Sequence, residues 1–537
     1  MEFDFVIVGA GSAGCVLAER LSASGRHRVL VLEAGGSDLR FFVQMPLGYG
    51  KTFYDPKVNW MYEAEPDPGL NGQRDYYPRG KILGGSSSIN AMVYIRGHRE
   101  DYEDWRRAGN RGWGWADVLP AYQAIEDYPA GDPAFRGTGG PLRITDIGSN
   151  AHPLCRPFIA ATEATGLAFN PDFNGAEQEG VGLYQLTTKG GRRLSAARAF
   201  LRPAMGRRNL AVETHAHVTR VLFAGRRAVG VEYVKGGRTL SVRASREVIL
   251  AGGAINTPQL LQLSGVGPAE LLAGLGIPIV AANANVGAHM QDHHGINYTW
   301  RMKVPTLNDA LRPWWGKLAA GLRYLLTRGG PLSLSVNQGG GFFRSDPAQP
   351  RPNMQLYMQA FSTLIPKPGE RPLLTPDPFS GLSLGLSNCR PTSTGDVMIK
   401  SADPFAHPRI RFHAFGTGKD VAEMLAAVKY LRHIAGQAPL AGLMAEELRP
   451  GPEVVSDTDL VHDFRQRSGT VYHHSCTCRM GPDPKTSVVD ASLRVHGLEA
   501  LRVCDASAFP NLIAGNTNAP ALMLGWRGAG IILKDAG

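Results

Sequence analysis

Cysteine and long apolar runs are both scarce in this sequence. The chain has 6 cysteines among 537 residues, too few for a disulfide framework, so we expect reduced thiols in a cytosolic protein. No stretch reaches the roughly 20 apolar residues that a membrane-spanning helix needs. Acidic residues at Glu2 and Asp4, where a strand begins, argue against a signal peptide. Together these absences predict a cytoplasmic globular protein.

A clustered basic surface is also missing, although basic residues are in excess. The formal net charge is +10, from 57 Lys and Arg against 47 Asp and Glu. The arginines occur as scattered pairs, such as Arg192 with Arg193, and no basic stripe with interleaved aromatics is present. We therefore expect no nucleic-acid partner. The length and the 43% of hydrophobic residues predict two or three domains.

The first strong motif lies at the N-terminus, in FDFVIVGAGSAGCVLAERLSASGRHRVLVLEAGG. It predicts a strand at residues 5–8, a glycine-rich turn, a helix at about residues 13–22 and a second strand at residues 29–32, which ends at Glu33. The glycines allow a tight turn and let a pyrophosphate lie against the helix N-terminus. Glu33 can accept hydrogen bonds from ribose hydroxyls. This unit is typical of dinucleotide binding, and it does not distinguish NAD from FAD.

Two further glycine-rich stretches lie later in the chain. GKILGGSSSINAMVYIRGHREDYEDW, residues 80–105, contains a loop suited to backbone contact with a cofactor. GGAINTPQLLQLSGVG, residues 252–267, follows a predicted strand. We expect Thr257 to be the N-cap of the helix in this stretch, with Pro258 in its first turn.

With these motifs, the chain resembles the glucose-methanol-choline (GMC) oxidoreductases, which are flavin-dependent alcohol oxidases and dehydrogenases. Residues 80–103 match the pattern of the first family signature, residues 253–267 match the second, and the N-terminal unit matches the FAD site. The resemblance continues through NVGAHMQDH (residues 285–293), SADPFAHPRI (residues 401–410) and the C-terminal region. It is strongest with the choline-dehydrogenase-like bacterial branch.

The resemblance implies an α/β fold with two parts. One is a discontinuous, Rossmann-like FAD-binding domain, and the other is an α+β substrate-binding domain with an antiparallel sheet. Because FAD motifs occur at both ends and in the middle of the chain, we assign residues 1–145, 190–297 and 459–537 to the FAD-binding domain. Residues 146–189 and 298–458 then form the substrate-binding domain.

Three segments of the substrate-binding domain carry specific expectations. Residues 354–361 (MQLYMQAF) and 381–389 (GLSLGLSNC) are predicted strands of the antiparallel sheet. The proline-rich run at residues 364–381 is either a loop over the entrance or an ordinary surface loop. A predicted helix that contains Trp314 and Trp315 is expected to pack into the core, with a lid or a membrane-surface patch as the alternative.

The resemblance also implies a catalytic pair. In the family, a histidine in a Tyr-His segment and a second histidine or asparagine face the flavin ring. Here VYHHSC supplies His473 and GNTNAP supplies Asn516, 43 positions later. Alcohol oxidation removes a proton from the hydroxyl and a hydride from the same carbon, and the hydride goes to flavin N5. We assign His473 as the general base and Asn516 as the amide that orients the substrate oxygen.

We expect the other reactive side chains near His473 to have structural roles, not catalytic ones. His474 is expected to pack or hydrogen-bond behind the site. Cys476 and Cys478 are two apart, a poor arrangement with His473 for one metal ion, so we expect core thiols and no metal site.

The remaining cofactor contacts are implied by the family motifs. Ile89 occupies the position where some relatives carry a histidine that tethers FAD, so the cofactor is expected to be non-covalent. Asn518 is the expected N-cap of the last helix, whose N-terminus would face the flavin. The expected FAD-binding residues are Gly9, Gly11, Ser12, Ala13, Gly14, Glu33, Ala34, Trp60, Gly80, Gly84, Gly85, Asn90, Ala91, Val93, Val218, Ala251, Gly252, Tyr472, Asp505, Ala506, Asn516 and Thr517.

The expected activity is oxidation of a primary alcohol, a CH–OH donor, to the aldehyde. Two alternatives are an oxidase that uses oxygen and a non-redox FAD-containing lyase of the same fold. The electron acceptor is a quinone, a dye, a redox protein or oxygen, and the location is cytoplasmic with peripheral contact to the inner membrane as an option. Gln338 stands where many choline-type relatives carry glutamate, which favours a neutral alcohol over choline. The sequence does not define the oligomeric state.

Overall fold

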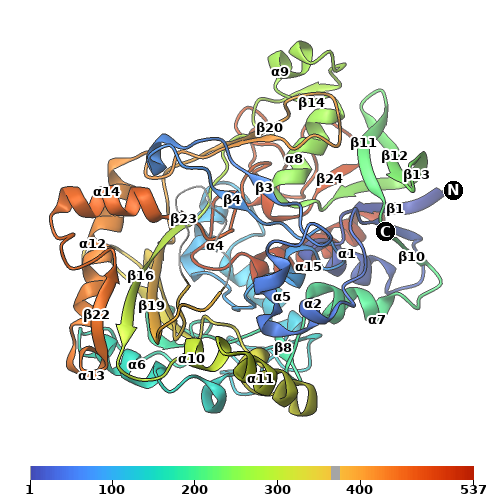
Figure 1. The fold of residues 1–537 in the computed structure, drawn as a ribbon. Helices are drawn as coiled ribbons and strands as arrows, with labels where there is room; N and C mark the ends of the chain where they lie inside the picture. The colour runs from blue at the N-terminus through green and yellow to red at the C-terminus, as the bar shows by residue number, and fades with distance from the viewer. Residues whose placement is uncertain (1, 364–374) are drawn as a thin grey trace.

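Two seven-stranded sheets organise the protein (Figure 1). The computed structural model describes residues 2–363 and 375–537. Figure 1 shows the first sheet at the end of the molecule where both termini lie, and the second sheet at the opposite end, beside α12 and α14. The expected mixed α/β fold with a separate antiparallel sheet is confirmed.

The first sheet is built around parallel strands that are buried on both faces. In β1 and β2 the apolar runs FVIV and VLVL pair in parallel, as in a dinucleotide-binding unit. β11 and β12 extend the sheet as an antiparallel arm. The strand order is β10-β2-β1-β13-β12-β11, with β24 also paired to β13. The strands are β1 (Glu2–Val8), β2 (Val29–Leu32), β10 (Leu210–Glu213), β11 (His217–Ala224), β12 (Arg227–Lys235), β13 (Arg238–Leu250) and β24 (Leu501–Val503).

Helices from both ends of the chain cover this sheet. The first helix, α1 (Ser12–Ser22), packs against the last helix, α15 (Asn518–Ala536). Gly525 makes the close approach possible, because a Cβ there would lie 2.8 Å from the Ala13 carbonyl oxygen. This contact holds the start of α1, which follows the glycine-rich turn after β1, against the C-terminal helix α15.

The second sheet is antiparallel throughout, with the order β22-β16-β19-β18-β17-β7 and with β23 paired to β16. The strands predicted at residues 354–361 and 381–389 are confirmed as β18 and β19. Both are buried along almost their whole length, because α12 packs on one side and the cavity wall lies on the other. The strands are β7 (Gly180–Leu183), β16 (His294–Met302), β17 (Gly339–Phe343), β18 (Met354–Gln359), β19 (Gly381–Asn388), β22 (Met444–Arg449) and β23 (Gly469–Thr470).

The expected domain boundaries stay a prediction. The three segments assigned to FAD binding supply all strands of the first sheet. However, β16 spans the expected boundary at residue 297, and β23 joins the second sheet from the C-terminal segment.

The smaller elements complete the chain. The helices are α2 (Phe41–Gln44), α3 (Tyr49–Thr52), α4 (Arg99–Arg107), α5 (Trp115–Ile125), α6 (Cys155–Glu163), α7 (Arg202–Ala204), α8 (Gly253–Leu263), α9 (Ala269–Gly274), α10 (Leu307–Leu311), α11 (Trp314–Thr327), α12 (Gly418–Ala435), α13 (Ala438–Ala441) and α14 (Asp457–Arg467). The short strands are β3 (Tyr62–Glu63), β4 (Tyr76–Tyr77), β5 (Glu126–Asp127), β6 (Leu142–Arg143), β8 (Thr188–Lys189), β9 (Arg192–Arg193), β14 (Val266–Gly267), β15 (Ala281–Ala282), β20 (Asp396–Met398) and β21 (Arg409–Arg411).

Two predicted helix starts are wrong. α8 begins at Gly253, so Thr257 lies inside the helix and is not its N-cap. The Thr257 hydroxyl instead donates to the Asp505 carboxylate at 2.6 Å. α15 has Thr517 at the N-cap position, and the side-chain oxygen of Asn518 accepts a hydrogen bond from the Ser12 hydroxyl at 2.7 Å. In both cases the side chain that we expected to cap the helix forms a hydrogen bond with a residue distant in the sequence instead.

The expectation that α11 packs into the core is also wrong. Only Ala320 and Tyr324 of this helix are buried, and Trp314 and Trp315 are 72% and 63% exposed. The helix lies at the edge of the molecule beside α10 (Figure 1). In the part of the chain that the structure describes, no helix is long and apolar enough to cross a bilayer. Most of the proline-rich run at residues 364–381 lies outside the described residues.

Candidate active site

A cavity of about 1110 Å³ lies between the two sheets. Its walls come from the turn after β1, the glycine-rich loop near residue 85, the start of α8, strands β18 and β19, and the segments before and at the start of α15. The predicted site residues that line it are Gly9, Gly11, Ser12, Ala13, Glu33, Ala34, Trp60, Gly80, Gly85, Asn90, Ala91, Val93, Val218, Ala251, Gly252, Tyr472, His473, Asp505, Ala506, Asn516 and Thr517.

Two predicted residues, Gly14 and Gly84, lie behind the cavity wall. A Cβ on Gly14 would lie 2.0 Å from the Gly9 carbonyl oxygen, so this glycine permits the contact between α1 and the turn. Gly84 has a φ of +87° and donates its N–H to the Ala10 carbonyl oxygen at 2.7 Å. Both shape the wall without facing the cavity.

The glycines at the cavity wall allow three backbone segments to meet. Gly9 has a φ of +102°, and a Cβ there would lie 2.6 Å from the Ala251 carbonyl oxygen. A Cβ on Gly85 would lie 2.7 Å from the Cα of Gly11. Any side chain at these positions would push a segment apart or fill the cavity. The arrangement gives an extended group close access to backbone N–H donors at the start of α1.

Glu33 closes this end of the cavity with a buried carboxylate. One oxygen accepts a hydrogen bond from the Ala10 N–H at 2.9 Å, and the other accepts one from the Gly35 N–H at 2.8 Å. Burial raises the pKa of Glu33 to about 7, although these two backbone hydrogen bonds act in the opposite direction. Each oxygen keeps a free lone pair, so the side chain can still accept hydrogen bonds from hydroxyl groups in the cavity.

At the other end of the cavity, His473 lies on a tightly turned segment. The backbone is left-handed at Tyr472 and Cys476, with φ of 70° at each. The His473 N–H donates to the Asp292 carboxylate at 2.8 Å, and the side chain is only 8% exposed. The turn and the carboxylate hold the imidazole at the cavity wall.

A chain of hydrogen bonds fixes the tautomer of His473. Nε2 of His293 lies 3.1 Å from the Cys389 carbonyl oxygen, which can only accept, so Nε2 carries the proton. Nδ1 of His293 is then an acceptor, and it lies 2.9 Å from Nδ1 of His473. The His473 proton therefore resides on Nδ1, which leaves a lone pair on Nε2.

Nε2 of His473 points at Asn516, with a separation of 3.1 Å from its Nδ2. The amide is oriented by Gln355, whose Nε2 donates to the Asn516 Oδ1 at 3.3 Å. A hydrogen-bond acceptor and a hydrogen-bond donor thus lie side by side at the cavity wall. Burial lowers the pKa of His473 well below its usual value, and the nearby His293 acts in the same direction. The imidazole is neutral at pH 7 and can accept a proton.

Sequence models of one family cover most of the chain. The N-terminal model of the GMC oxidoreductases matches residues 3–295, and the C-terminal model matches residues 391–525. The chain belongs to the GMC oxidoreductase family. The resemblance seen in its motifs is therefore confirmed.

Relatives of this GMC protein align over nearly its whole length. It is 42% identical to the mitochondrial choline dehydrogenase of Homo sapiens, with 99% of this chain and 90% of the relative covered. It is 43% identical to an alcohol dehydrogenase [acceptor] of Pseudomonas putida, with 99% and 96% covered. Among solved structures, pyridoxine 4-oxidase from Mesorbium loti superposes with a TM-score of 0.88 at 32% identity and covers 98% of each chain. A formate oxidase gives a TM-score of 0.92 at 26% identity, with 99% and 98% covered.

Behind His473 and Asn516 of this GMC protein lies the buried carboxylate of Asp292. Asp292 accepts hydrogen bonds from His474 Nδ1 at 2.8 Å and from the Thr470 hydroxyl. Although burial acts to raise the pKa of Asp292, its interaction with His474, including the hydrogen bond, lowers that pKa below its usual value. The His474 ring also packs edge-on against Tyr77, with centroids 4.4 Å apart. His474 therefore supports the segment from behind, as expected from the sequence.

The two cysteines near His473 are inert core thiols in geometry and chemistry. Cys476 and Cys478 are buried and unpaired, and burial raises the pKa of Cys476 to about 12. Within residues 2–363 and 375–537, no group of three or more potential metal-binding side chains is present.

Gln338 does not face the cavity, so the argument that linked it to substrate charge is wrong. Its side chain is 3% exposed, accepts a hydrogen bond from the His152 N–H at 2.7 Å and donates one to the Ser335 carbonyl oxygen. It satisfies two backbone groups that would otherwise be buried without partners. Among the described residues that line the cavity, the only carboxylates are Glu33 and Asp505, and both lie in cofactor motifs.

Sequence reasoning missed Asp292, His293 and Gln355. The run QDHHG, residues 291–295, places three titratable side chains in succession after an otherwise uncharged loop, and this was an available signal. No sequence signal pointed to Gln355, because its role depends on which face of β18 contacts the segment before α15.

Proposed function

We propose that this GMC-family protein oxidises a neutral primary alcohol to the aldehyde with FAD bound non-covalently. The observation that carries the proposal is the pair of His473 Nε2 and Asn516 Nδ2, 3.1 Å apart at the wall of the cavity. A neutral base beside an amide donor is what removal of a hydroxyl proton requires. The cavity of about 1110 Å³ extends from the turn at Gly9 to this pair.

The chain's own residues fit FAD at the opposite end. The close backbone approach at Gly9, Gly11 and Gly85 would accept a pyrophosphate, and Glu33 would hold ribose hydroxyls. The N-terminus of α15 reaches the cavity wall at Thr517, where its dipole would favour negative charge. When bound, FAD supplies a two-electron acceptor for the hydride from the alcohol carbon. Ile89 offers no nucleophile for a covalent link, which supports non-covalent binding.

The proposed roles of the pair follow from their geometry. The lone pair on His473 Nε2 takes the hydroxyl proton of the alcohol. Asn516 Nδ2 donates a hydrogen bond to the same oxygen as its negative charge grows. His293 keeps the His473 proton on Nδ1 throughout, because its own Nδ1 remains an acceptor.

A neutral substrate is supported by the cavity wall. The described lining includes Tyr357, Gln359 and Phe361, and its only carboxylates are Glu33 and Asp505. A quaternary ammonium would lose its hydration there without a described carboxylate partner other than these two.

For the electron acceptor, the relatives support two variants. The Pseudomonas putida relative is named for an unspecified acceptor, and a Rhizobium etli relative at 39% identity is an oxygen-dependent choline dehydrogenase. An artificial dye, a quinone or a redox protein serves as acceptor in the first variant, and oxygen in the second. All six cysteines are buried and unpaired, which supports a cytoplasmic location.

The test is a panel of primary alcohols assayed with a dye acceptor and, in parallel, by oxygen consumption. Dye reduction and aldehyde formation without oxygen uptake support a dehydrogenase. Oxygen uptake at a matching rate would replace that variant by an oxidase. If no alcohol in the panel is turned over with either the dye or oxygen, alcohol oxidation is rejected in favour of a lyase or a flavin-binding protein.

A further inference from the structure

Helix α11 carries an exposed apolar stripe. Its side chains there are far more exposed than the interior of a globular protein allows, with Leu326 at 82% and Leu318 at 55%. At about 100° per residue, the exposed apolar side chains fall on one side of the helix, opposite the buried pair Ala320 and Tyr324. The stripe therefore faces away from the protein. Its members are Trp314, Trp315, Leu318, Leu322, Leu325 and Leu326.

A neighbouring segment adds further exposed apolar side chains beside α11. Leu39, Phe41 and Phe42 are 67%, 51% and 46% exposed. Phe41 packs edge-on against Tyr324 of α11, with ring centroids 6.4 Å apart. We call these three residues together with the apolar stripe the α11 patch. Exposed apolar side chains gathered on and beside one helix in this way mark an interaction surface.

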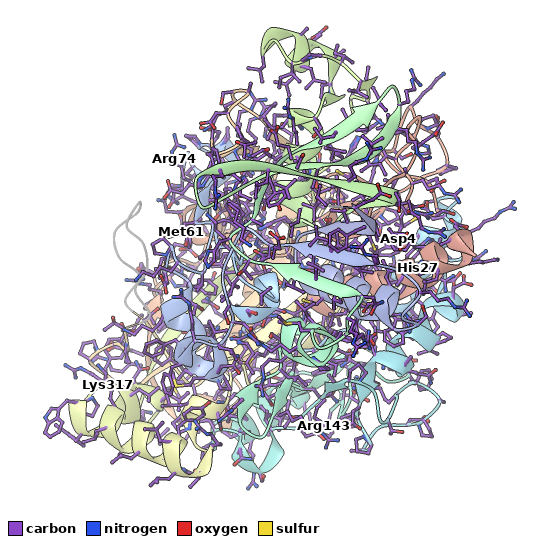
Figure 2. All side chains as sticks on the ribbon, turned by 90° about the vertical axis from the view of Figure 1, so that its right-hand side faces the viewer. Asp4, His27, Met61, Arg74, Arg143 and Lys317 are labelled. Atoms are coloured by element: carbon purple, nitrogen blue, oxygen red, sulfur yellow. The ribbon has the colours of Figure 1, made fainter. Side chains whose placement is uncertain are left out.

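The charges around the α11 patch are basic. α11 contains no acidic residue, and its exposed Lys317 and Arg323 flank the apolar stripe on either side. Arg312 and Arg328 stand just before and after the helix. Figure 2 shows α11, with Lys317 labelled, at the edge of the molecule. An apolar face with tryptophans and a basic rim is the pattern of a helix that lies in the surface of an anionic bilayer.

A second copy of the chain fits this surface less well. A symmetric contact through α11 would bring Lys317 and Arg323 of both copies to the same interface, where like charges repel. Crossing the bilayer is also excluded for α11, because 14 residues span about 21 Å at 1.5 Å each, less than the hydrocarbon core of about 30 Å.

The α11 patch borders the cavity. Lys317 of α11 and Phe42 of the neighbouring segment both line the cavity wall, together with Leu311 and Leu332 nearby. We propose that the α11 patch docks this protein on an anionic phospholipid bilayer and places the mouth of the active-site cavity against the lipid surface. An apolar alcohol could then enter from the membrane. The docking stands by itself, and only this delivery of substrate rests on the proposed function.

The test uses the purified, FAD-containing protein and sedimentation with vesicles. We expect binding to vesicles of phosphatidylcholine with phosphatidylglycerol, weaker binding to phosphatidylcholine alone, and loss with added salt. The double variant Leu322→Glu/Leu326→Glu should bind the mixed vesicles at least about tenfold less. The control Ile279→Glu changes a side chain outside the patch that is 47% exposed, close to the 50% of Leu322, and should bind as the wild type does.

Two readouts keep this result separate from the enzymatic proposal. Turnover of a short, water-miscible alcohol with a dye should be the same in the double variant and the wild type, whichever activity the protein has. Equal vesicle binding by the double variant, or no binding by the wild type, would overturn the docking proposal. So would a dimer that the double variant abolishes in the absence of vesicles, because it would show that a second copy covers the patch.

Discussion

Nδ1 of His473 lies 2.9 Å from Nδ1 of His293, and Nε2 of His293 lies 3.1 Å from the Cys389 carbonyl oxygen. Because a carbonyl can only accept, this sequence of contacts leaves one consistent arrangement of protons. It directs the lone pair of His473 toward Asn516 and the cavity. The catalytic assignment therefore depends on a neighbour that lies 180 positions away in the sequence.

Replacing His473 should affect chemistry more than cofactor binding. We expect His473→Ala to keep FAD and to reduce it by alcohol about two to four orders of magnitude more slowly, since the general base is lost. His474→Ala, whose native side chain bonds only the buried Asp292, should cost much less. Anaerobic stopped-flow reduction measures both. Reversed effects would show that the two histidines were assigned the wrong way round.

His293 should act as a positioning residue. In His293→Ala the Nδ1 proton of His473 loses its acceptor, and we expect reduction to slow by about ten- to a hundredfold, as for other partners that orient a functional histidine. His293→Gln, which offers an amide oxygen to the same proton, should recover part of the rate. The pH profile of reduction should also change in His293→Ala, because the pKa of His473 is lowered in part by His293. An unchanged rate and profile would show that His293 only packs.

Stability should decrease on acidification because buried histidines are held neutral. Burial lowers the pKa of His293 to about 4 and lowers that of His474 as well. The unfolded chain, with histidine pKa near 6.5, then binds more protons, so stability is full above about pH 6.5 and falls as the pH approaches the folded value. Each such histidine contributes up to about 1.4 kcal/mol per pH unit.

His294 provides an internal counterweight to this effect. Burial alone would lower its pKa, but the hydrogen bond with Asp75 raises it, so His294 adds stability at low pH. Glu33, whose pKa is raised to about 7 by burial, acts in the same direction as His294. The net slope should still show falling stability, since the histidines with lowered pKa outnumber these two groups. Chemical unfolding of the holoprotein at several pH values measures the slope. Stability that is flat or rises between about pH 6.5 and 4.5 would contradict these buried neutral states.

FAD should leave the denatured protein completely. Ile89 is buried against Val43, Val58 and Ile82, and its hydrocarbon side chain cannot form a bond to the flavin. After acid precipitation we expect all yellow colour in the supernatant and the unmodified polypeptide mass in the pellet. Flavin that stays with the pellet, or a mass increase in the peptide that contains Ile89, would refute non-covalent binding.

Substrate charge should be discriminated because the described cavity lining has no carboxylate other than Glu33 and Asp505. We expect a higher kcat/KM for a neutral primary alcohol than for choline, because no described carboxylate near Tyr357 or Gln359 offsets the loss of ammonium hydration. Alcohols of similar size, with and without the charge, give the matched comparison. A clear preference for choline would contradict this expectation and would indicate that aromatic side chains bind the ammonium group.

Local patterns predicted the elements of this fold well where the sequence itself encodes the contact. The apolar runs at β1 and β2 and the glycines between them require a strand, a turn and a helix, and all three occur where expected. The start of α8 was misplaced because Thr257 bonds Asp505, a contact across 248 positions that no local rule contains. α11 was misjudged because an apolar stripe has the same spacing whether it faces a core or a membrane.

Some residues of the candidate site could also be predicted from the sequence, and others could not. His473 and Asn516 were identified through their motifs, and the structure brings them within 3.1 Å. Gln338 was given a role that depended on the direction of its side chain, which sequence does not define. His293 and Gln355 act through contacts between the second sheet and the C-terminal segments, so they became visible only with the fold.

Anaerobic reduction of the bound flavin by a primary alcohol tests the central claim most directly. The account predicts that the visible flavin absorption bleaches on addition of alcohol, that aldehyde forms in equal amount, and that His473→Ala slows the bleaching while it retains FAD. A flavin that stays fully oxidised with every alcohol in the panel, in protein that demonstrably contains FAD, would contradict it.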